Sequence, residues 1–200
     1  MDQKKTQPDQ QTIDEILNLL KSGKLNNAKT KIENYIKKFP RSFVLFNILG
    51  AVYVGQDQLE VAINYHKKSI EINPDYAEGY NNLGIAFQKL GLFEEAVKNY
   101  NKTLKLKPNF APAYNNLGIV FKSLNKLDEA LMNAKKAIEL DSEYAEAHNN
   151  IGAIFQDLDN LEEAHKYYKK AIKLKPNYSD AYYNLGILLK KLDKIEECIE

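Results

Sequence analysis

Apolar residues along this chain recur at the three- and four-residue spacings of amphipathic helices, beginning at Ile13. From Phe46 onward the pattern returns at a fixed interval. The segment Tyr-Asn-Asn-Leu-Gly that starts at Tyr80 comes back 34 residues later at Tyr114, and variants of it start at Phe46, His148 and Tyr182. A fixed period without insertions predicts an array of helical repeats rather than the core of a globular enzyme.

Residues that end helices recur in the same register. One such residue stands in each repeat: Gly23, Asp57, Gly91, Asn125, Asp159 and Asp193. Gly, Asn and Asp tolerate the left-handed backbone conformation at a helix end, so a tight turn between two helices is predicted in every repeat. Prolines mark the links between repeats, and we expect the residues that follow them, Asp75, Asn109 and Asn177, to cap the next helix.

The domain organisation follows from this register. Residues 1–11 are polar and are predicted to be a disordered N-terminal tail, and residues 12–200 form the repeat array. The repeats lie at approximately 9–42, 43–76, 77–110, 111–144, 145–178 and 179–200, the last of them truncated. Apolar residues of that last repeat would be poorly covered: Ile187, Leu188, Leu192, Ile195 and Ile199. We therefore expect self-association, a partner or a further domain at the C-terminal end.

Glycine stands inside the first helix of every repeat except the most divergent, the first. These glycines are Gly50, Gly84, Gly118, Gly152 and Gly186. The second helices carry a small residue in register: Ala28, Ala62, Ala96, Ala130, Ala164 and Cys198. Because glycine costs about 1 kcal/mol in a helix interior relative to alanine, we predict that the two helices of each repeat cross closely at these positions.

These residues resemble the tetratricopeptide repeat family, whose pattern places aromatic, Leu-Gly, aromatic, Ala, aromatic, Ala and Pro positions at fixed offsets. Residues 77–110 supply Tyr80, Leu83, Gly84, Phe87, Ala96, Tyr100, Thr103 and Pro108. Residues 145–178 match similarly, whereas His66 and Ala134 stand where an aromatic residue is usual. The resemblance implies an all-α fold, an α-solenoid of stacked helix-turn-helix units that forms a right-handed superhelix.

Asparagines recur in pairs along the predicted first helices. One line consists of Asn82, Asn116, Asn150 and Asn184, and the first three of these directly follow Asn81, Asn115 and Asn149. An amide can hold the backbone of an extended peptide whatever its sequence. The line is similar to the asparagine ladder of O-GlcNAc transferase repeats, which in that family contacts substrate polypeptide. The alternatives are that these side chains bond neighbouring repeats or face water.

Composition excludes other classes of function. Lys and Arg total 28 against 27 Asp and Glu, so a net charge of +1 gives no reason to expect nucleic acid or an anionic membrane as partner. The acidic residues Glu78, Glu146 and Asp180 beside the asparagines argue against a site for a C-terminal carboxylate.

The three histidines lack metal-ligand spacing, and the single Cys198 excludes an internal disulfide. We expect no cofactor, no catalytic centre and no signal peptide, and therefore a cytoplasmic protein.

Two functional hypotheses remain. The first is a non-catalytic scaffold for protein–protein interaction that binds a peptide in the groove lined by the first helices. The second is the N-terminal substrate-recruiting arm of a larger enzyme, such as a glycosyltransferase of the O-GlcNAc type. RNA binding, as in pentatricopeptide arrays, is disfavoured because those repeats are slightly longer and usually basic.

Overall fold

The computed structural model describes residues 6–192, which form eleven α-helices and no strand. The helices are α1 (Gln10–Lys21), α2 (Leu25–Lys38), α3 (Phe43–Gly55), α4 (Leu59–Ile72), α5 (Ala77–Lys89), α6 (Phe93–Leu106), α7 (Ala111–Ser123), α8 (Leu127–Leu140), α9 (Ala145–Asp157), α10 (Leu161–Leu174) and α11 (Ser179–Lys191). Within residues 6–192, none of these helices has the length and apolar character needed to cross a bilayer.

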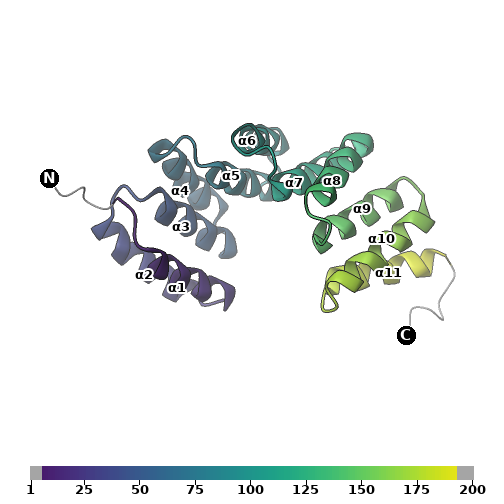
Figure 1. Cartoon of the computed structure of the whole chain (residues 1–200), viewed down its shortest axis with the longest axis horizontal. Helices are drawn as coiled ribbons and strands as arrows, with labels where there is room; N and C mark the ends of the chain where they lie inside the picture. The colour runs from purple at the N-terminus through teal and green to yellow at the C-terminus, as the bar shows by residue number, and fades with distance from the viewer. Residues whose placement is uncertain (1–5, 193–200) are drawn as a thin grey trace. The chain divides into compact units, whose positions relative to one another are not determined.

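The chain divides into two compact units, residues 1–107 with α1–α6 and residues 108–200 with α7–α11. In each unit every helix packs against the next one along the chain (Figure 1). First helices of adjacent repeats also touch, α3 with α5 in the first unit, and α9 with both α7 and α11 in the second. We call the surface formed by α3 and α5, and that formed by α7, α9 and α11, the first-helix face of each unit.

The turns inside the repeats have the predicted backbone. Positive φ angles between 57° and 74° occur at Gly23, Asp57, Gly91, Asn125 and Asp159. These are the residues that the sequence pattern identified, so the prediction is confirmed for five repeats. Asp193, the sixth, lies outside the described residues.

Helix starts differ from the sequence prediction. The residues that cap α5, α7 and α11 are Tyr76, Phe110 and Tyr178, and none of them makes a side-chain capping bond. The prediction that Asp75, Asn109 and Asn177 cap these helices was therefore wrong, because the turn after each proline extends one residue further. In the turn before α5, the backbone N–H of Asp75 instead donates to the side chain of Asn73 at 3.2 Å.

The first helix begins earlier than expected. The Asp9 carboxylate accepts a hydrogen bond from the Thr12 backbone N–H at 2.8 Å and caps α1, so that Gln10 and Gln11 are already helical. The predicted tail of residues 1–11 thus overlaps α1. Gln7 also contacts the array, since its side-chain oxygen accepts a bond from the buried Ser42 hydroxyl at 2.6 Å.

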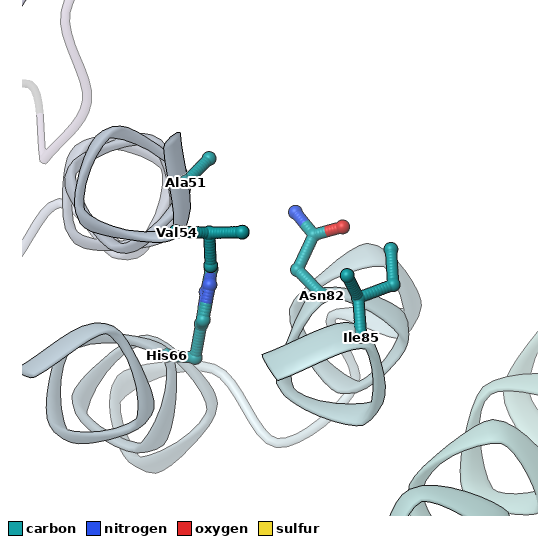
Figure 2. Close-up of a pocket in the computed structure, with 5 residues that line it drawn as sticks. All are labelled: Ala51, Val54, His66, Asn82 and Ile85. Carbon is teal, nitrogen blue, oxygen red and sulfur yellow. The ribbon is translucent and has the colours of Figure 1, made fainter. Parts of the chain in front are cut away.

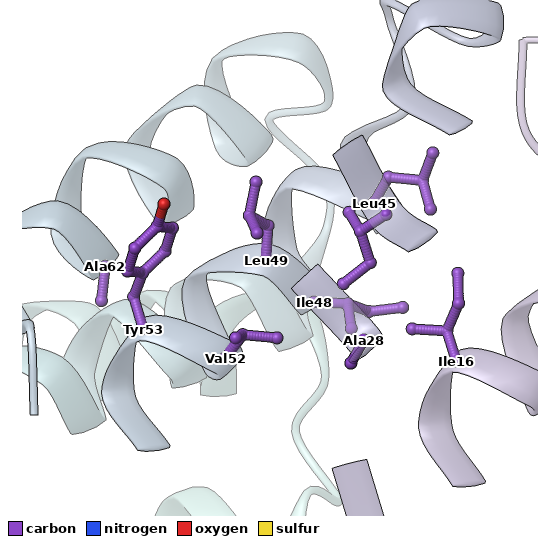
Figure 3. Close-up of a cluster of buried hydrophobic side chains, with 9 residues drawn as sticks. Ile16, Ala28, Leu45, Ile48, Leu49, Val52, Tyr53 and Ala62 are labelled. Atoms are coloured by element: carbon purple, nitrogen blue, oxygen red, sulfur yellow. The ribbon is translucent and has the colours of Figure 1, made fainter. Parts of the chain in front are cut away.

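Apolar side chains of neighbouring helices form the core between repeats. In the first unit a continuous cluster extends from α1 to α4 (Figure 3). Its buried members are Ile16, Ala28, Ile32, Leu45, Ile48, Leu49, Val52, Tyr53 and Ala62. In the second unit Leu188 is fully buried against Ala164 and Tyr168. The prediction that Leu188 lacks cover was therefore wrong, whereas Ile187 is 43% exposed as expected. Ile195 and Ile199 lie outside the described residues.

The helical glycines make room for a ring from the second helix, sixteen residues later. A Cβ atom added at Gly84 would lie 2.6 Å from the Tyr100 ring, and one added at Gly152 would lie 2.7 Å from the Tyr168 ring. At Gly50 the imidazole of His66 takes the same place, at 2.6 Å. At these three glycines the ring therefore lies nearest to the added Cβ atom, and the close crossing with the small residue of the second helix stays a prediction.

The exception is the repeat in which the ring position holds alanine. A Cβ atom at Gly118 would meet the Ala130 carbonyl oxygen at 3.2 Å and the Ala134 Cβ at 3.3 Å. Here the backbones themselves approach, and the predicted close crossing is confirmed. The first repeat has isoleucine at both positions: Ile16 stands where the later repeats have glycine, and Ile32 stands where three of them have the ring. Both isoleucines are fully buried.

Replacing Gly84 by alanine tests this fit. Tyr100 is fully buried and its hydroxyl donates to Gln88 at 2.7 Å, so the ring cannot move away from the new methyl group. We expect Gly84→Ala to lower the free energy of unfolding by about 1–3 kcal/mol in urea denaturation. The matched control is Gly55→Ala, whose methyl group would meet only the flexible end of Leu25 at 3.2 Å. An equal effect of the two substitutions would contradict this packing.

Candidate functional site

The paired asparagines occupy two different environments on the first helices. Asn81, Asn115 and Asn149 are buried, with 4–6% of their surface exposed. The residues that follow them, Asn82, Asn116, Asn150 and Asn184, are half-buried. The two lines that the sequence predicted as one peptide-binding set are therefore distinct, and the second line is the more accessible.

A hydrogen bond connects the asparagines of successive repeats within each unit. The side-chain N–H of Asn150 donates to the Asn115 oxygen at 2.8 Å, and that of Asn184 donates to the Asn149 oxygen at 3.0 Å. In the first unit, Asn82 donates to Asn47 at 3.2 Å. Of the alternatives weighed from sequence, bonding between neighbouring repeats is confirmed for these three pairs. Whether the same side chains bind peptide stays a prediction.

Asn47 is a member of the buried line that sequence reasoning missed. It stands 34 residues before Asn81, but the residue after it is Ile48, so it does not belong to an asparagine pair. The register alone could have identified it.

Tyrosine hydroxyls complete this network. The Asn47 amide N–H donates to the Tyr76 hydroxyl at 3.2 Å, and Tyr144 and Tyr178 have the corresponding bonds from Asn115 and Asn149. Burial raises the pKa of Tyr178 to about 12, so that this hydroxyl stays protonated at neutral pH. Asn47, Asn115 and Asn149 therefore use both ends of the amide, the oxygen for an asparagine of the next repeat and the N–H for a tyrosine.

The acidic residues beside the asparagines are paired with lysines of the following link. Lys107 bonds Glu78 at 2.9 Å, and Lys175 bonds Glu146 at 2.6 Å. Partial burial is the largest influence and raises the pKa of Glu78, but the hydrogen bond and the charge of Lys107, together with a backbone hydrogen bond, hold that pKa below its ordinary value. Lys122 likewise pairs with Asp157 at 2.9 Å. These three lysines are therefore paired with carboxylates of the chain itself.

An apolar hollow of about 130 Å³ lies beside Asn82 on the first-helix face of the first unit. Figure 2 shows Ala51 and Val54 on α3 and Asn82 and Ile85 on α5, with the ring of His66 from α4 between the two helices. Sequence reasoning did not predict the hollow, although it noted that His66 replaces an aromatic residue.

The histidines serve packing where the structure describes them in detail. His66 has none of its surface exposed, and its Nδ1 lies 2.9 Å from the Asn47 oxygen. His148 is 7% exposed and its Nε2 donates to the Ser142 carbonyl oxygen at 3.0 Å. Residues 6–192 contain no group of three His, Cys, Asp or Glu side chains that could hold a metal ion. Cys198 lies outside the described residues.

Coupling between the asparagines can be measured with a double-mutant cycle. Asn115→Ala and Asn150→Ala each remove one side of the same hydrogen bond, so we expect each to cost about 1–2 kcal/mol of unfolding free energy. The double variant should lose less unfolding free energy than the two single variants lose together, and the difference is a coupling energy of about 1 kcal/mol. Asn101→Ala on the exposed surface of α6 is the control, with an effect below about 0.5 kcal/mol. Simple additivity would show that the bond contributes nothing.

His66 predicts a pH dependence of stability. Burial lowers its pKa from 6.5 to about 4, so the unfolded chain binds one more proton than the folded chain between these pH values. Stability is then fully present above pH 6.5 and is lost as pH falls from 6.5 to 4, by about 3 kcal/mol. Urea denaturation of the wild type and of His66→Phe across this range isolates the effect. Parallel pH profiles of the two proteins would contradict it.

Three family models of tetratricopeptide repeats match the chain. Two models described as tetratricopeptide repeat match residues 77–110 and 145–178, and residues 99–132 and 167–200. A third, described as TPR repeat, matches residues 50–91 and 120–159. Together they cover residues 50–200 without a gap. A search of curated proteins finds no significant match.

Solved structures of tetratricopeptide repeat proteins are among those with a similar fold. A thermophilic tetratricopeptide repeat protein of Thermus thermophilus is 21% identical, with a TM-score of 0.81 over 90% of this chain and 98% of that one. The MamA structure is 25% identical, with a TM-score of 0.65 over 80% and 93%. YrrB is 22% identical, with a TM-score of 0.61 over 86% and 89%.

These matches agree with the helical pairs, the positive-φ turns and the glycine–ring contacts described above. The matching family models describe repeats, and none of them describes a catalytic domain. The chain belongs to the tetratricopeptide repeat family.

Proposed function

We propose that this protein is a non-catalytic scaffold that binds an extended segment of a partner protein along its first-helix faces. The observation that carries the proposal is the line of half-buried amides formed by Asn82, Asn116, Asn150 and Asn184. Asn150 and Asn184 each use one N–H for the preceding repeat. An amide has a second N–H and an acceptor oxygen, which can meet the backbone of a peptide.

Apolar side chains accompany these amides. Ile85, Ala153 and Ile187 each follow an asparagine by three residues, and such residues lie on the same side of a helix. Ile85 lines the hollow beside Asn82, and Ile187 is 43% exposed. Alternating amides and apolar surfaces suit an extended peptide, whose backbone gives affinity and whose alternate side chains give specificity.

A related structure agrees with this kind of function. YrrB is described as a tetratricopeptide repeat protein with an unusual peptide-binding site. At 22% identity the likeness shows the fold alone, so the proposal rests on the residues of this chain.

A displayed library of random dodecapeptides tests the proposal. Peptides selected on the whole chain should lose at least tenfold in affinity when Asn82→Ala and Ile85→Ala are combined, in fluorescence titrations at a temperature where circular dichroism shows the variant folded. Asn64→Ala with Asn101→Ala is the matched control, because both residues are exposed on the second helices α4 and α6. Failure to select any peptide, or equal losses in both double variants, would contradict binding on this face.

The asparagine pattern also supports a second candidate, in which the array recruits substrates to the catalytic domain of a larger O-GlcNAc-type glycosyltransferase. Catalysis would then come from a separate domain, because the described residues offer packing histidines and no metal cluster. An antibody against the array should detect a polypeptide much larger than these 200 residues in cell extracts. Detection of a band at the size of the array alone would favour the stand-alone scaffold.

A further inference from the structure

The outward face of α8 differs from that of the other second helices. α8 packs against α7 and α9, and its buried residues are small: Ala130, Asn133, Ala134 and Ala137. On the opposite side of the helix, Met132 is 65% exposed. The residues in register with it on the other described second helices are polar: Thr30, Asn64, Lys98 and Lys166. An exposed apolar side chain at this place is therefore a departure that the fourth repeat alone shows within residues 6–192.

Charged residues flank Met132 symmetrically. Two acidic residues precede it by four and three positions, Asp128 and Glu129, and two lysines follow it by three and four positions, Lys135 and Lys136. Lys136 is half-buried and the other three are exposed. With 3.6 residues per turn, all five side chains lie on one side of the helix. This face of α8 is therefore acidic before its centre, apolar at its centre and basic after it.

Such a face is complementary to itself. When two copies of α8 meet antiparallel about a two-fold axis at Met132, the part of the face before the axis lies against the part after it on the other copy. Around the helix, Asp128 and Lys135 lie to one side of Met132, and the other acid and lysine lie to the opposite side. Asp128 therefore faces Lys135 of the second copy, and Glu129 faces Lys136. Opposite charges then surround a contact between the two methionines.

The central residue distinguishes α8 from the other second helices. Those helices also tend to begin acidic and end basic, because such charges complement the helix dipole. In α6 and α10, however, Lys98 and Lys166 would place two ammonium groups against each other on the axis. In α4 the central residue is Asn64, and Val61 stands in register with Glu129. Of the described second helices, α8 alone combines complementary charges with an apolar centre.

The two lysines make surface contacts with their own chain. Lys136 bonds the exposed Glu139 at 2.8 Å, and the Lys135 ammonium lies 5.8 Å from the centroid of the Phe155 ring. Exposed contacts of this kind contribute little to stability, so the long lysine side chains can turn toward a carboxylate of a second copy. Methionine is flexible and polarizable, and two of them can pack together without a rigid fit.

We propose that the outward face of α8 binds the same face of a second copy of this chain, as an antiparallel helix pair with Met132 on the two-fold axis. The contact is one helix wide and smaller than a standard interface, so we expect weak association at high protein concentration. The proposal does not rest on the proposed function, because α8 belongs to neither first-helix face. A dimer of this kind would present those faces twice.

Disulfide trapping tests the geometry. With Cys198 replaced by alanine, Met132→Cys carries its single thiol on the proposed axis. Under mild oxidation we expect it to form a covalent dimer at least tenfold faster than Asn64→Cys or Lys166→Cys in the same background. These controls place the thiol at the same exposed position of α4 and α10. Equal rates for the three variants would overturn the proposal.

Sedimentation equilibrium of the full chain measures the affinity. Met132→Lys introduces the residue that α6 and α10 carry at this position, so it should fold, and we expect it to raise the dissociation constant of the dimer at least tenfold. Asn64→Lys is the matched control and should leave the constant unchanged. A wild type that stays monomeric up to its solubility limit, or undiminished association of Met132→Lys, would contradict the assignment.

Exchange of charges tests the ion pairs. Asp128→Lys with Glu129→Lys makes the face basic, and Lys135→Glu with Lys136→Glu makes it acidic, so neither double variant should self-associate. An equimolar mixture of the two should form a heterodimer whose affinity falls as salt is added. A mixture that stays monomeric, although circular dichroism shows both variants folded, would overturn the pairing.

Association through the C-terminal end is the competing outcome. On α11, Tyr183 is 70% exposed and Ile187 is 43% exposed, so a second copy could pack there instead. Tyr183→Ser combined with Ile187→Ser should leave the dimer unchanged if α8 forms the interface. Loss of association in this variant, with the Met132→Lys variant still dimeric, would move the interface to α11 and overturn the proposal.

Discussion

The recurring interaction on which both units depend is the hydrogen bond from a half-buried asparagine to the buried asparagine of the preceding repeat. A solenoid has no central core, so its stability comes from each repeat and from the interface with its neighbour. The Asn150–Asn115 and Asn184–Asn149 bonds cross such interfaces at 2.8 and 3.0 Å. The Asn115 and Asn149 amides also bond Tyr144 and Tyr178, which directly precede α9 and α11, and therefore hold their own helix to the first helix of the next repeat at two points.

This network gives one residue two uses. Asn150 and Asn184 each bond the preceding repeat through one N–H, and an apolar residue, Ala153 or Ile187, follows each of them by three positions on the first-helix face. A scaffold of this kind needs no reorganisation before it binds, because packing already orients the amide. The cost is that such an asparagine cannot be replaced without loosening the interface between repeats. Binding and stability must therefore be measured together in any variant of these residues.

Much of the fold could be predicted from sequence, because it is encoded in local chemistry repeated in register. Gly23, Asp57 and Asn125 identify the turns since few residues adopt positive φ. The helix caps were missed because an aromatic residue without a capping side chain starts α5. A pattern of small residues does not show which ring lies nearest to a helical glycine, and at Gly84 that ring is Tyr100, sixteen residues later. The buried role of Asn115 depends on contacts across repeats, which periodicity does not specify.

The most direct test of this account is NMR of the side-chain amides of Asn150 and Asn184, with and without a selected peptide. The two protons of each amide give separate signals. The account predicts that one proton exchanges slowly with solvent in both states, because it bonds the preceding repeat, and that the other shifts when peptide binds. Rapid exchange of both protons would contradict the inter-repeat bond, and two signals that ignore the peptide would contradict the binding role.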